Sequence, residues 1–470
     1  MFMMGHNQLP PRLKKFRRLV YISQVITILS FTLLLWTYRS NMTFQSWTQY
    51  YQATSEIPLP VQLTVPPKHV PEQKVPFVAV NGTQTLLVSA YLEHRTGKGE
   101  VRVIAVVLRS ETVVYHCLFR CQEQLRISEG VSDIHSDHFG FAYGTADIMC
   151  PLPSSCETPS HIAVTSAAAN SEDILHIEFL EVKNQKAQND FFPYNFTVCL
   201  STMFEFTNVL QLVQSLEMLQ LLGVNRVVVY KTSSSPETQR ILDYYTYKGL
   251  VEVIPWSLSR FLNVSRGWLP LHGPGDLHYF GQIPALNDCV YRHMYQSRYV
   301  ALHDLDELIL AQSVKSWLEL LPLLEKKYGA DKCYLFENNV FPNTVPPPPT
   351  SQTLPPQSCC RSWQNVSGVN ILAHLYQEPI LNSYESTKYI VNPRAVFSAT
   401  VHGPLSSLKG YSFVDRNIAR MYHTRAAKQT ELTPDQLIYD GRLLNYSTQL
   451  IPNVDTVLRK SGLLPEHNIH

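Results

Sequence analysis

Strand-like and helix-like segments alternate between residues 196 and 302, and this alternation constrains the fold more than any other feature. Three short apolar runs have the composition of buried strands: FTVCLS (196–201), RVVVY (226–230) and LVEVI (250–254). A helical apolar stripe that stops at Gly223 separates the first two runs. Ser235 and Pro236 begin a second helix before the third run. Strands joined by helices in this way predict a parallel, three-layer sheet.

A fourth strand-like run ends in a group of carboxylates. A helix near 285–297 leads into YVALHD, and Asp304, Asp306 and Glu307 follow its apolar part. Ligands bind at the carboxyl ends of parallel strands in open α/β sheets. Residues i and i+2 of a strand point the same way, so we expect Asp304 and Asp306 to project together. Such acids repel each other and are costly to desolvate, which predicts a cation among them.

An Asp-x-Asp pair is a common way of holding Mg²⁺ or Mn²⁺ against phosphate oxygens. No glycine-rich phosphate loop follows any of the predicted strands. A metal held by Asp304 and Asp306 would therefore supply the cradle for a diphosphate. The alternative is that the two acids only form a turn or a helix cap. If they do hold a metal, Asp306→Asn relieves a repulsion and leaves stability unchanged or slightly raised.

The segments on either side of this region differ from it. Residues 77–185 contain short β-like runs, and HRTGKG (94–99) separates two of them as a hairpin loop does. We expect a small β-sandwich there, with a structural or carbohydrate-binding role. Residues 192–450 form the predicted catalytic domain and 451–470 a C-terminal tail. The proline-rich stretch 341–360 is predicted to be a surface insertion or a mobile loop.

The first part of the chain predicts a membrane anchor. Residues 19–38 are long and apolar enough to span a bilayer, and basic residues precede them. The positive-inside rule makes 1–18 a cytosolic tail and 39–76 a proline-rich stem on the far side. A cleaved signal peptide is the alternative. We expect a single-pass type II protein of the Golgi membrane with a lumenal catalytic domain.

Cysteines and glycosylation sequons agree with an oxidising compartment. All nine cysteines follow residue 38, and Cys117 and Cys121 are predicted to pair with Cys150 and Cys156. A zinc site is a weaker alternative. Sequons in this part are expected to carry glycans; they lie at Asn81, Asn195, Asn263, Asn365 and Asn445. Asn41 also begins a sequon but is predicted to lie too close to the bilayer.

Composition excludes one class of partner. The chain has 39 Lys and Arg residues against 38 Asp and Glu residues, so there is no electrostatic reason to expect nucleic acid binding. Apolar residues make up 45% of the sequence, which is enough for a sizeable core.

Several blocks of the sequence resemble glycosyltransferase family 92. They occur in the family's order between about residues 77 and 450, and they include GQIPALNDCVYRHMYQSRYVALHDLDELIL, KYIVNPRAVFSATVH and YHTR. The resemblance implies a GT-A type nucleotide-sugar transferase fold with a half-Rossmann parallel sheet, preceded by the β-rich domain and the signal anchor. It also implies inverting transfer of galactose from UDP-galactose to a terminal β-galactoside of glycoprotein glycans. The implied linkage is β-1,4, and the implied cofactor is Mn²⁺.

The resemblance also implies roles for individual residues. Asp304 and Asp306 are the expected ribose and metal carboxylates, and Glu307 either shares their role or orients the turn. His423, or else His402, is the expected histidine ligand of the metal. Further nucleotide or sugar contacts are expected from residues near the strand ends and from two basic side chains; they are Ser201, Thr202, Gln282, Asn287, Asp288, Lys388 and Arg394. Asn287 and Asp288 could equally begin a helix, and the two basic residues could be surface charges.

Inverting transfer needs a carboxylate base for the acceptor hydroxyl. Glu337, Glu378 and Asp415 lie in suitable blocks, and the sequence does not choose between them. Two other functions stay open. One is a different nucleotide-sugar transferase on the same fold, and the other is a non-enzymatic, membrane-anchored lectin-like protein.

Overall fold

The structure is a computed structural model that describes residues 77–122, 124–167, 177–187, 191–346, 361–381 and 384–465. The predicted tail, membrane segment and stem, residues 1–76, lie outside the described residues, as does 347–360 of the proline-rich stretch. Within the described ranges, no helix is both long and apolar enough to cross a membrane.

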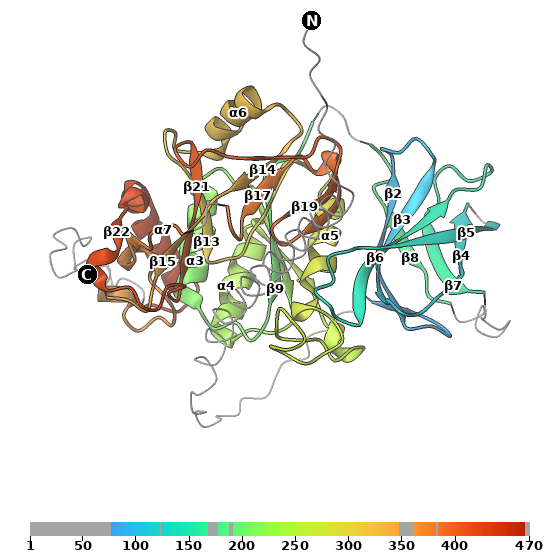
Figure 1. Cartoon of the computed structure of the whole chain (residues 1–470), viewed down its shortest axis with the longest axis horizontal. Helices are drawn as coiled ribbons and strands as arrows, with labels where there is room; N and C mark the ends of the chain where they lie inside the picture. Colours follow the sequence, from blue (N-terminus) through green and yellow to red (C-terminus); the bar gives the residue numbers. More distant parts are fainter. Residues whose placement is uncertain are drawn as a thin grey trace, which may run out of the picture. The chain divides into compact units, whose positions relative to one another are not determined.

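The N-terminal domain consists of eight strands in one sheet (Figure 1). The strands are β1 (Val78–Val80), β2 (Thr85–Glu93), β3 (Glu100–Leu108), β4 (Tyr115–Cys121), β5 (Gln124–Ile134), β6 (Tyr143–Pro151), β7 (His161–Ser166) and β8 (Leu180–Lys183). They pair in the order β1-β2-β3-β6-β5-β4-β7-β8, and β8 pairs again with β2. This last, parallel pairing closes seven of the strands into a barrel. Closure leaves none of the seven with an unpaired edge.

The predicted fold class, a GT-A type α/β protein preceded by a small β-rich domain, is wrong for this chain. The structure is 36% strand and 23% helix, and its first domain is a closed barrel. The signal anchor predicted at 19–38 lies outside the described residues. The predicted β-sandwich is wrong because the barrel is closed. Alternation of apolar and polar residues indicates which face of a strand is buried. Closure of the barrel depends instead on the pairing of β2 with β8, which lies far along the chain.

The second domain contains a mixed seven-stranded sheet. Its order is β11-β10-β9-β12-β17-β14-β20, and β9, β10, β11 and β12 run parallel. The strands are β9 (Tyr194–Met203), β10 (Arg226–Lys231), β11 (Val251–Pro255), β12 (Ser297–Leu302), β14 (Cys333–Phe336), β17 (Lys388–Val391) and β20 (Tyr411–Phe413). The four strands predicted from the alternating pattern are therefore present, and they are parallel as expected. Strand β17 is antiparallel to both β12 and β14, which the sequence pattern did not predict.

Five α-helices and several smaller pairs of strands complete this domain. The helices are α3 (Val209–Leu221), α4 (Pro236–Tyr247), α5 (Gln282–Arg292), α6 (Trp317–Tyr328) and α7 (Ser447–Lys460). A three-stranded sheet contains β13 (Glu307–Ala311), β15 (Asn338–Pro342) and β21 (Ala419–Arg425). The remaining pairs are β16 (Tyr376–Gln377) with β22 (Ile438–Tyr439), and β18 (Val396–Thr400) with β19 (Gly403–Ser407). Short 3-10 helices lie at 258–260, 279–281, 361–363, 371–373, 393–395, 434–436 and 442–446.

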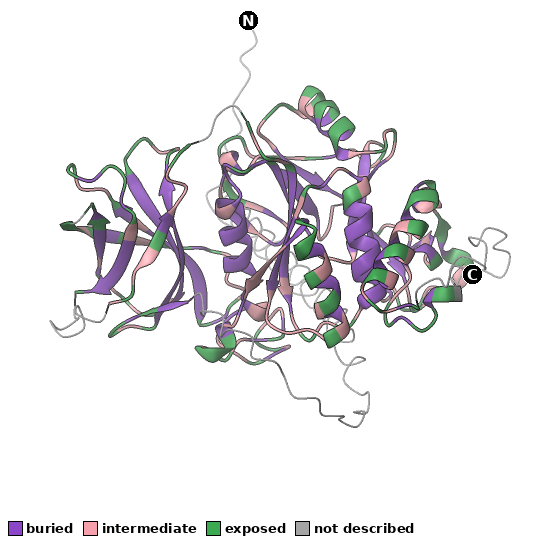
Figure 2. Cartoon of the chain, turned by 180° about the vertical axis from the view of Figure 1, so that it is seen from behind, coloured by how far each residue is buried: buried purple, intermediate pink, exposed green. Residues whose placement is uncertain are grey.

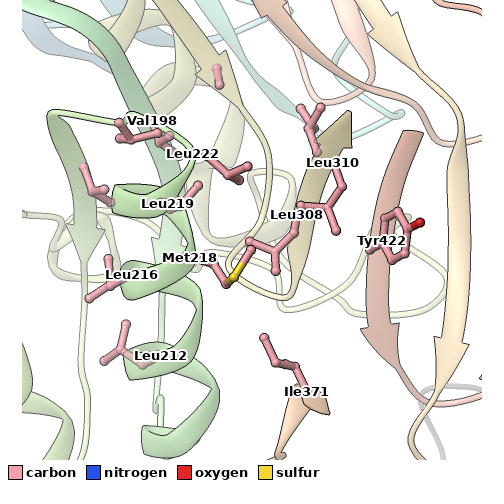
Figure 3. Packing of buried hydrophobic residues seen from close by; sticks show 14 of the residues in the cluster. Val198, Leu212, Leu216, Met218, Leu219, Leu222, Leu308, Leu310, Ile371 and Tyr422 are labelled. Carbon is pink, nitrogen blue, oxygen red and sulfur yellow. The ribbon is translucent and has the colours of Figure 1, made fainter. Parts of the chain in front are cut away.

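Helix α3 lies at the centre of the larger core. The predicted apolar stripe is there, and Figure 3 shows Leu212, Leu216 and Leu219 on the helix and Met218 beside Leu308 of β13. Four polar side chains of α3 are buried as well; they are Gln211, Gln214, Ser215 and Glu217. Glu217, for example, accepts a hydrogen bond of 2.6 Å from the Tyr245 hydroxyl. Burial of α3 from Val209 to Leu219 ties the acid-bearing strand β13 to the parallel sheet, and Figure 2 shows most of both elements in the buried colour.

The last helix also belongs to this core. Leu450, Val454 and Leu458 of α7 are fully buried in the same cluster as the apolar residues of α3. The predicted boundary between the catalytic domain and a C-terminal tail at residue 450 therefore falls inside a core helix.

The described cysteines form three disulfides in the two domains. Cys117 pairs with Cys150 and Cys121 with Cys156. This confirms that the four cysteines pair among themselves, and it settles the individual pairing, which the sequence had left open. A third disulfide joins Cys199 of β9 to Cys289 of α5. Among the described cysteines only Cys333 is free, and it is buried.

A buried carboxylate joins the barrel to the second domain. Asp288 of α5 accepts hydrogen bonds from the hydroxyls of Tyr91 (2.6 Å) and Tyr230 (2.5 Å) and pairs with Arg292 at 2.8 Å. Burial alone would raise the pKa of Asp288, but Arg292 and Lys183 lower it below its usual range. Because Tyr91 comes from β2 of the barrel, this one carboxylate couples the two domains.

We expect Asp288→Asn to lower the free energy of unfolding by about 3 kcal/mol, because it removes a buried charge that three donors share. Asp455→Asn is a matched control, since Asp455 pairs with Arg459 at the same four-residue spacing and the same 2.8 Å on the partly exposed surface of α7. The control should lose about 1 kcal/mol at most. Urea denaturation of both variants measures the difference, and equal losses would show that the junction does not depend on Asp288.

Candidate active site

The three acids follow strand β12 in a short connection to β13. Residues 303–306 are not part of a strand, so the expectation that Asp304 and Asp306 share a strand face is wrong. A turn holds them instead. The backbone N–H of Glu307 donates to the carbonyl of Asp304 at 3.2 Å, and the Asp304 N–H donates to the Glu307 carboxylate at 2.7 Å. Glu307 thus shapes the turn that presents the two aspartates.

A lysine supplies the cation that the acids require. The ammonium of Lys388, at the start of β17, lies 2.7 Å from the Asp304 carboxylate and 3.4 Å from that of Glu307. Burial alone would lower the pKa of Lys388, but Asp304 and Glu307 raise it above its usual value. The prediction that Lys388 faces phosphate oxygens therefore needs correction, because its charge in this structure neutralises the two carboxylates.

A histidine holds the other aspartate. His423 of β21 lies directly opposite Glu307 in the sheet pairing. Its Nε2 is 3.2 Å from Asp306, and its Nδ1 is 3.4 Å from Glu307. Partial burial would raise the pKa of Asp306, but His423, Arg425 and Lys388 outweigh it and lower the pKa to about 2. Asp306 is therefore a carboxylate at any physiological pH.

The five side chains of the site fall into two groups by their exposed fraction. The side chains of Asp304 and Asp306 are 36% and 37% exposed, whereas those of Glu307, Lys388 and His423 are 2%, 4% and 8% exposed. Burial raises the pKa of Glu307, with Lys388 and His423 opposing the rise and the two aspartates adding to it. The aspartates are therefore the two side chains of the five that open most to solvent, and Glu307 takes the orienting role.

Gln282 connects the acids to the end of β9. Its side-chain amide lies 3.4 Å from Asp304 and donates to the carbonyl of Ser201 at 3.2 Å. The Gln282 side-chain oxygen and the Thr202 hydroxyl are buried without a hydrogen-bond partner among the described residues. The structure thus brings Ser201, Thr202 and Gln282 near the acids, and their contacts with nucleotide or sugar stay a prediction.

Asn287 and Asp288 lie elsewhere, and their predicted contacts with nucleotide or sugar are wrong. The Asn287 amide donates to the carbonyls of Ile283 and Ala399 at 2.9 Å each, and its oxygen accepts from the Ala399 N–H. Asn287 therefore fastens α5 to β18, and Asp288 faces the barrel. Both are 1% exposed, and their polar atoms are committed to these contacts within the protein.

Arg394 was also predicted to pair with phosphate, and the structure contradicts this. Its guanidinium donates to the carbonyls of Met294, Ser297 and Arg298 at 2.5 to 2.7 Å, and it lies over the ring of Phe192. These carbonyls are at the beginning of β12, whereas the acids follow its end. The donors of Arg394 are thus committed to backbone at the wrong end of the strand.

Two of the three candidate bases have structural roles. Glu378 accepts hydrogen bonds from the backbone of Lys428 (2.6 Å) and from the backbone and side chain of Gln429, so it fixes that loop. Asp415 is partly exposed, pairs with Lys327 at 3.5 Å and accepts from the Asn417 N–H. Each carboxylate is therefore already engaged in hydrogen bonds or an ion pair with neighbouring residues.

The third candidate is closer to the acids in the sheet. Glu337 follows Phe336, which pairs with Lys388 across strands β14 and β17. Its side chain is 2% exposed, and Arg416 lies 3.5 Å from it. One oxygen of Glu337 has no hydrogen-bond partner within the described ranges.

The sequence analysis did not predict two residues beside the site, His303 and Arg425. It named a third, His402, only as the alternative histidine ligand of the metal. His303 is buried and contacts the Asp304 carbonyl at 2.8 Å, and its position directly before Asp304 was the available signal. Arg425 helps to lower the pKa of Asp306, and only its place in the YHTR block could have indicated this. Burial, followed by the charge of Lys388, lowers the pKa of His402 to about 4, which places that imidazole near the amine.

The donor set suits a hard divalent cation only in part. Asp306 and His423 lie 3.2 Å apart and Asp304 is also partly exposed, which gives oxygen and imidazole ligands of the kind Mn²⁺ accepts. However, no group of three or more His, Cys, Asp or Glu in the described part of the chain is arranged as a metal site. The residues therefore fit a metal that has two or three protein ligands and completes its shell with phosphate and water.

Comparisons with known proteins identify the family. The model of glycosyltransferase family 92 matches residues 194–462, which is more than half of the chain. A glycosyltransferase family 92 protein from Caenorhabditis elegans is 28% identical over 118 residues, a match that covers 25% of this chain and 23% of the relative. The match thus spans less than a quarter of that relative's length. The acids, Lys388 and His423 all lie within the matched region, and the chain belongs to glycosyltransferase family 92, a family of glycosyltransferases.

Proposed function

We propose that the protein transfers galactose from UDP-galactose to a terminal β-galactoside of glycoprotein glycans, with inversion and a β-1,4 linkage. The supporting observation is that Asp304 and Asp306 are partly exposed at the carboxyl end of the parallel strands, where the buried ammonium of Lys388 pairs with Asp304. Family membership supports glycosyl transfer. The choice of galactose and of linkage rests on sequence blocks that most resemble those of the bird β-galactoside β-1,4-galactosyltransferase.

A cavity at the carboxyl ends of the parallel strands suits the nucleoside of the donor. It has a volume of about 530 Å³ and is lined by residues that follow three parallel strands, namely Phe204 after β9, Thr232 after β10 and Trp256 after β11. Phe280 stacks on Phe204 with ring centres 4.3 Å apart, two residues before Gln282. Volumes of this size accommodate nucleotide-sized ligands. We place the nucleoside in this cavity and the diphosphate toward Asp304 and Asp306.

The chemistry breaks one bond and forms another at the anomeric carbon. The bond between that carbon and the phosphate oxygen breaks with its electron pair leaving on UDP, while the acceptor oxygen attacks from the opposite face. A divalent metal held by Asp306, His423 and Asp304 would supply Lewis acidity toward the diphosphate. Glu307 and Lys388 keep the two aspartates in place.

The acceptor hydroxyl must lose its proton to a base as the new bond forms. We assign this role to Glu337. The reason is its position after the strand partner of Lys388, together with an Oε1 that accepts no described hydrogen bond and lies 3.5 Å from Arg416. Glu378 and Asp415 are engaged in their own loops.

A lumenal location agrees with the covalent features of the protein. Three disulfides favour an oxidising compartment. The asparagines of the five downstream sequons are all exposed; they are Asn81, Asn195, Asn263, Asn365 and Asn445. We therefore propose a single-pass type II Golgi protein whose catalytic domain is lumenal and glycosylated.

The test is a transfer assay with the full-length chain purified in detergent, using a panel of UDP-sugars, lactose as the acceptor and added Mn²⁺. We expect UDP-galactose to be preferred and the product to be a β-1,4-linked digalactosyl end by NMR. An α-linked product or preference for another donor would favour a different transferase of the same family. UDP or glycan binding without turnover would favour the lectin-like alternative.

A further inference from the structure

An aromatic cluster lies next to the acids, and the functions proposed so far do not use it. Its members are Phe139, Trp268, His278, Tyr279 and His402. Trp268 stacks on His402 with the rings 8° from parallel and their centres 5.6 Å apart, and it stacks on Tyr279 at 5.5 Å. Phe139 stacks on His278 at 4.1 Å and meets Trp268 edge to face. All but His278 are partly exposed, so the cluster forms part of the surface.

His402 connects this cluster to the acids. Its carbonyl accepts a hydrogen bond of 2.6 Å from the Thr387 hydroxyl, and its Nδ1 lies 3.1 Å from the Thr387 carbonyl. Thr387 immediately precedes Lys388, whose ammonium contacts Asp304. A ligand on the face of the cluster would therefore lie beside the aspartates.

His278 indicates that the cluster receives a polar ligand. Its side chain is buried, with the residue only 3% exposed, and neither ring nitrogen has a hydrogen-bond partner among the described residues. An unpaired buried polar group is costly, and native proteins usually satisfy such groups. A stacked imidazole with two free nitrogens can both donate to and accept from a hydroxyl group.

We propose that this cluster binds the terminal galactose of the acceptor, an inference that rests on the proposed function. Galactose has an apolar face of C–H groups, which suits stacking on Trp268, and a rim of hydroxyls, which suits the nitrogens of His278. Stacked aromatic rings and a few hydrogen-bonding groups are the usual composition of a ligand site of this kind.

The proposal also gives the barrel a function. Phe139 lies between β5 and β6 of the barrel, while the other four members belong to the second domain. The two domains are joined next to the cluster, since the Tyr143 N–H donates to the Asp276 carbonyl at 2.9 Å. The barrel thus completes the acceptor site through one aromatic side chain.

The test compares acceptor and donor kinetics in the full-length protein. We expect Trp268→Ala, Phe139→Ala and His278→Phe each to raise KM for lactose about tenfold, the effect of losing one stacking or hydrogen-bonding contact of this class. KM for UDP-galactose and the rate of UDP-galactose hydrolysis without acceptor should stay within about twofold of wild type. Trp268→Phe keeps an aromatic face and should recover most of the affinity for lactose.

His278→Phe separates binding from folding. It preserves the stacked ring and removes two unpaired nitrogens, so its melting temperature should not fall even as KM for lactose rises. Tyr247→Ala is the matched control, because this tyrosine of α4 is 89% exposed and lies outside both proposed sites.

Lactose binding is also measured directly, by saturation-transfer NMR, so that the result does not depend on transfer. Binding that Trp268→Ala weakens supports the inference even if UDP-galactose proves to be the wrong donor. Unchanged lactose KM and binding in folded Trp268→Ala and His278→Phe would overturn it. A parallel rise in KM for UDP-galactose would also overturn it, since the cluster would then belong to the donor site.

Discussion

Lys388→Met is expected to abolish transfer and to lower the free energy of unfolding by about 3–5 kcal/mol, the usual cost of removing one partner from a buried ion pair. Methionine nearly matches the length of lysine, so the effect comes from the charge. Lys388 is 4% exposed in its side chain and lies 2.7 Å from Asp304 and 3.4 Å from Glu307. Without it, the 2%-exposed Glu307 carboxylate has lost its main counter-charge.

The pH dependence of this loss has a definite sign. Lys388 lowers the pKa of Glu307, so its removal raises that pKa further above the unfolded value. A carboxyl group with a raised pKa in the folded state binds its proton more tightly there, and stability then falls as pH rises through that pKa. The gap in stability between Lys388→Met and wild type should therefore widen from pH 5 to pH 8.

Two further variants make the Lys388 result specific. Lys409→Met removes a lysine that pairs with Asp331 at 3.1 Å but is 57% exposed, and it should cost about 1 kcal/mol at most. Adding Glu307→Gln to Lys388→Met should restore part of the stability but none of the activity. If Lys388→Met is no less stable than Lys409→Met in urea denaturation, the ammonium does not hold the acids together.

The sequence predicted the parallel part of the second domain because its signals are local. Ser235 caps α4 by accepting from the Thr238 N–H, and Gly223 follows α3 with a φ of +99°, so each boundary is encoded by one residue type at one position. Closure of the barrel was not predictable in this way. It depends on β2 meeting β8, and nothing in the period of either strand encodes its partner.

The same contrast between local signals and long-range pairing applies to the candidate site. The acids and Gln282 could be placed together because each follows or precedes a predicted element. The family resemblance put His423 at the same metal as the aspartates, and the structure has it 3.2 Å from Asp306. The pairing of Asp304 with Lys388 could not be assigned from sequence, because Lys388 comes from a strand far along the chain. Arg394 and Lys388 look equivalent in KYIVNPRAVF, yet the short 3-10 helix at 393–395 directs Arg394 to the far end of β12.

Asp306→Asn is expected to lower the transfer rate by orders of magnitude and to reduce stability slightly. The sequence led to the opposite expectation for stability, since two neighbouring carboxylates should repel. The structure shows that His423, Arg425 and Lys388 outweigh that repulsion and lower the pKa of Asp306 to about 2. Because the side chain is 37% exposed and partly screened, the loss should be about 1 kcal/mol or less.

Activity depends on a different property of the same carboxylate. If Asp306 and His423 hold a divalent metal against the donor diphosphate, the amide removes a charged ligand and with it several kcal/mol of leaving-group stabilisation. Chelation of the wild type should produce the same loss, and added Mn²⁺ should restore wild type but not Asp306→Asn. Thermal melts and transfer assays across one Mn²⁺ titration measure both effects together. A folded Asp306→Asn protein with near-normal, chelator-insensitive transfer would contradict the metal proposal. The contact between Asp306 and His423 would then have a structural role only.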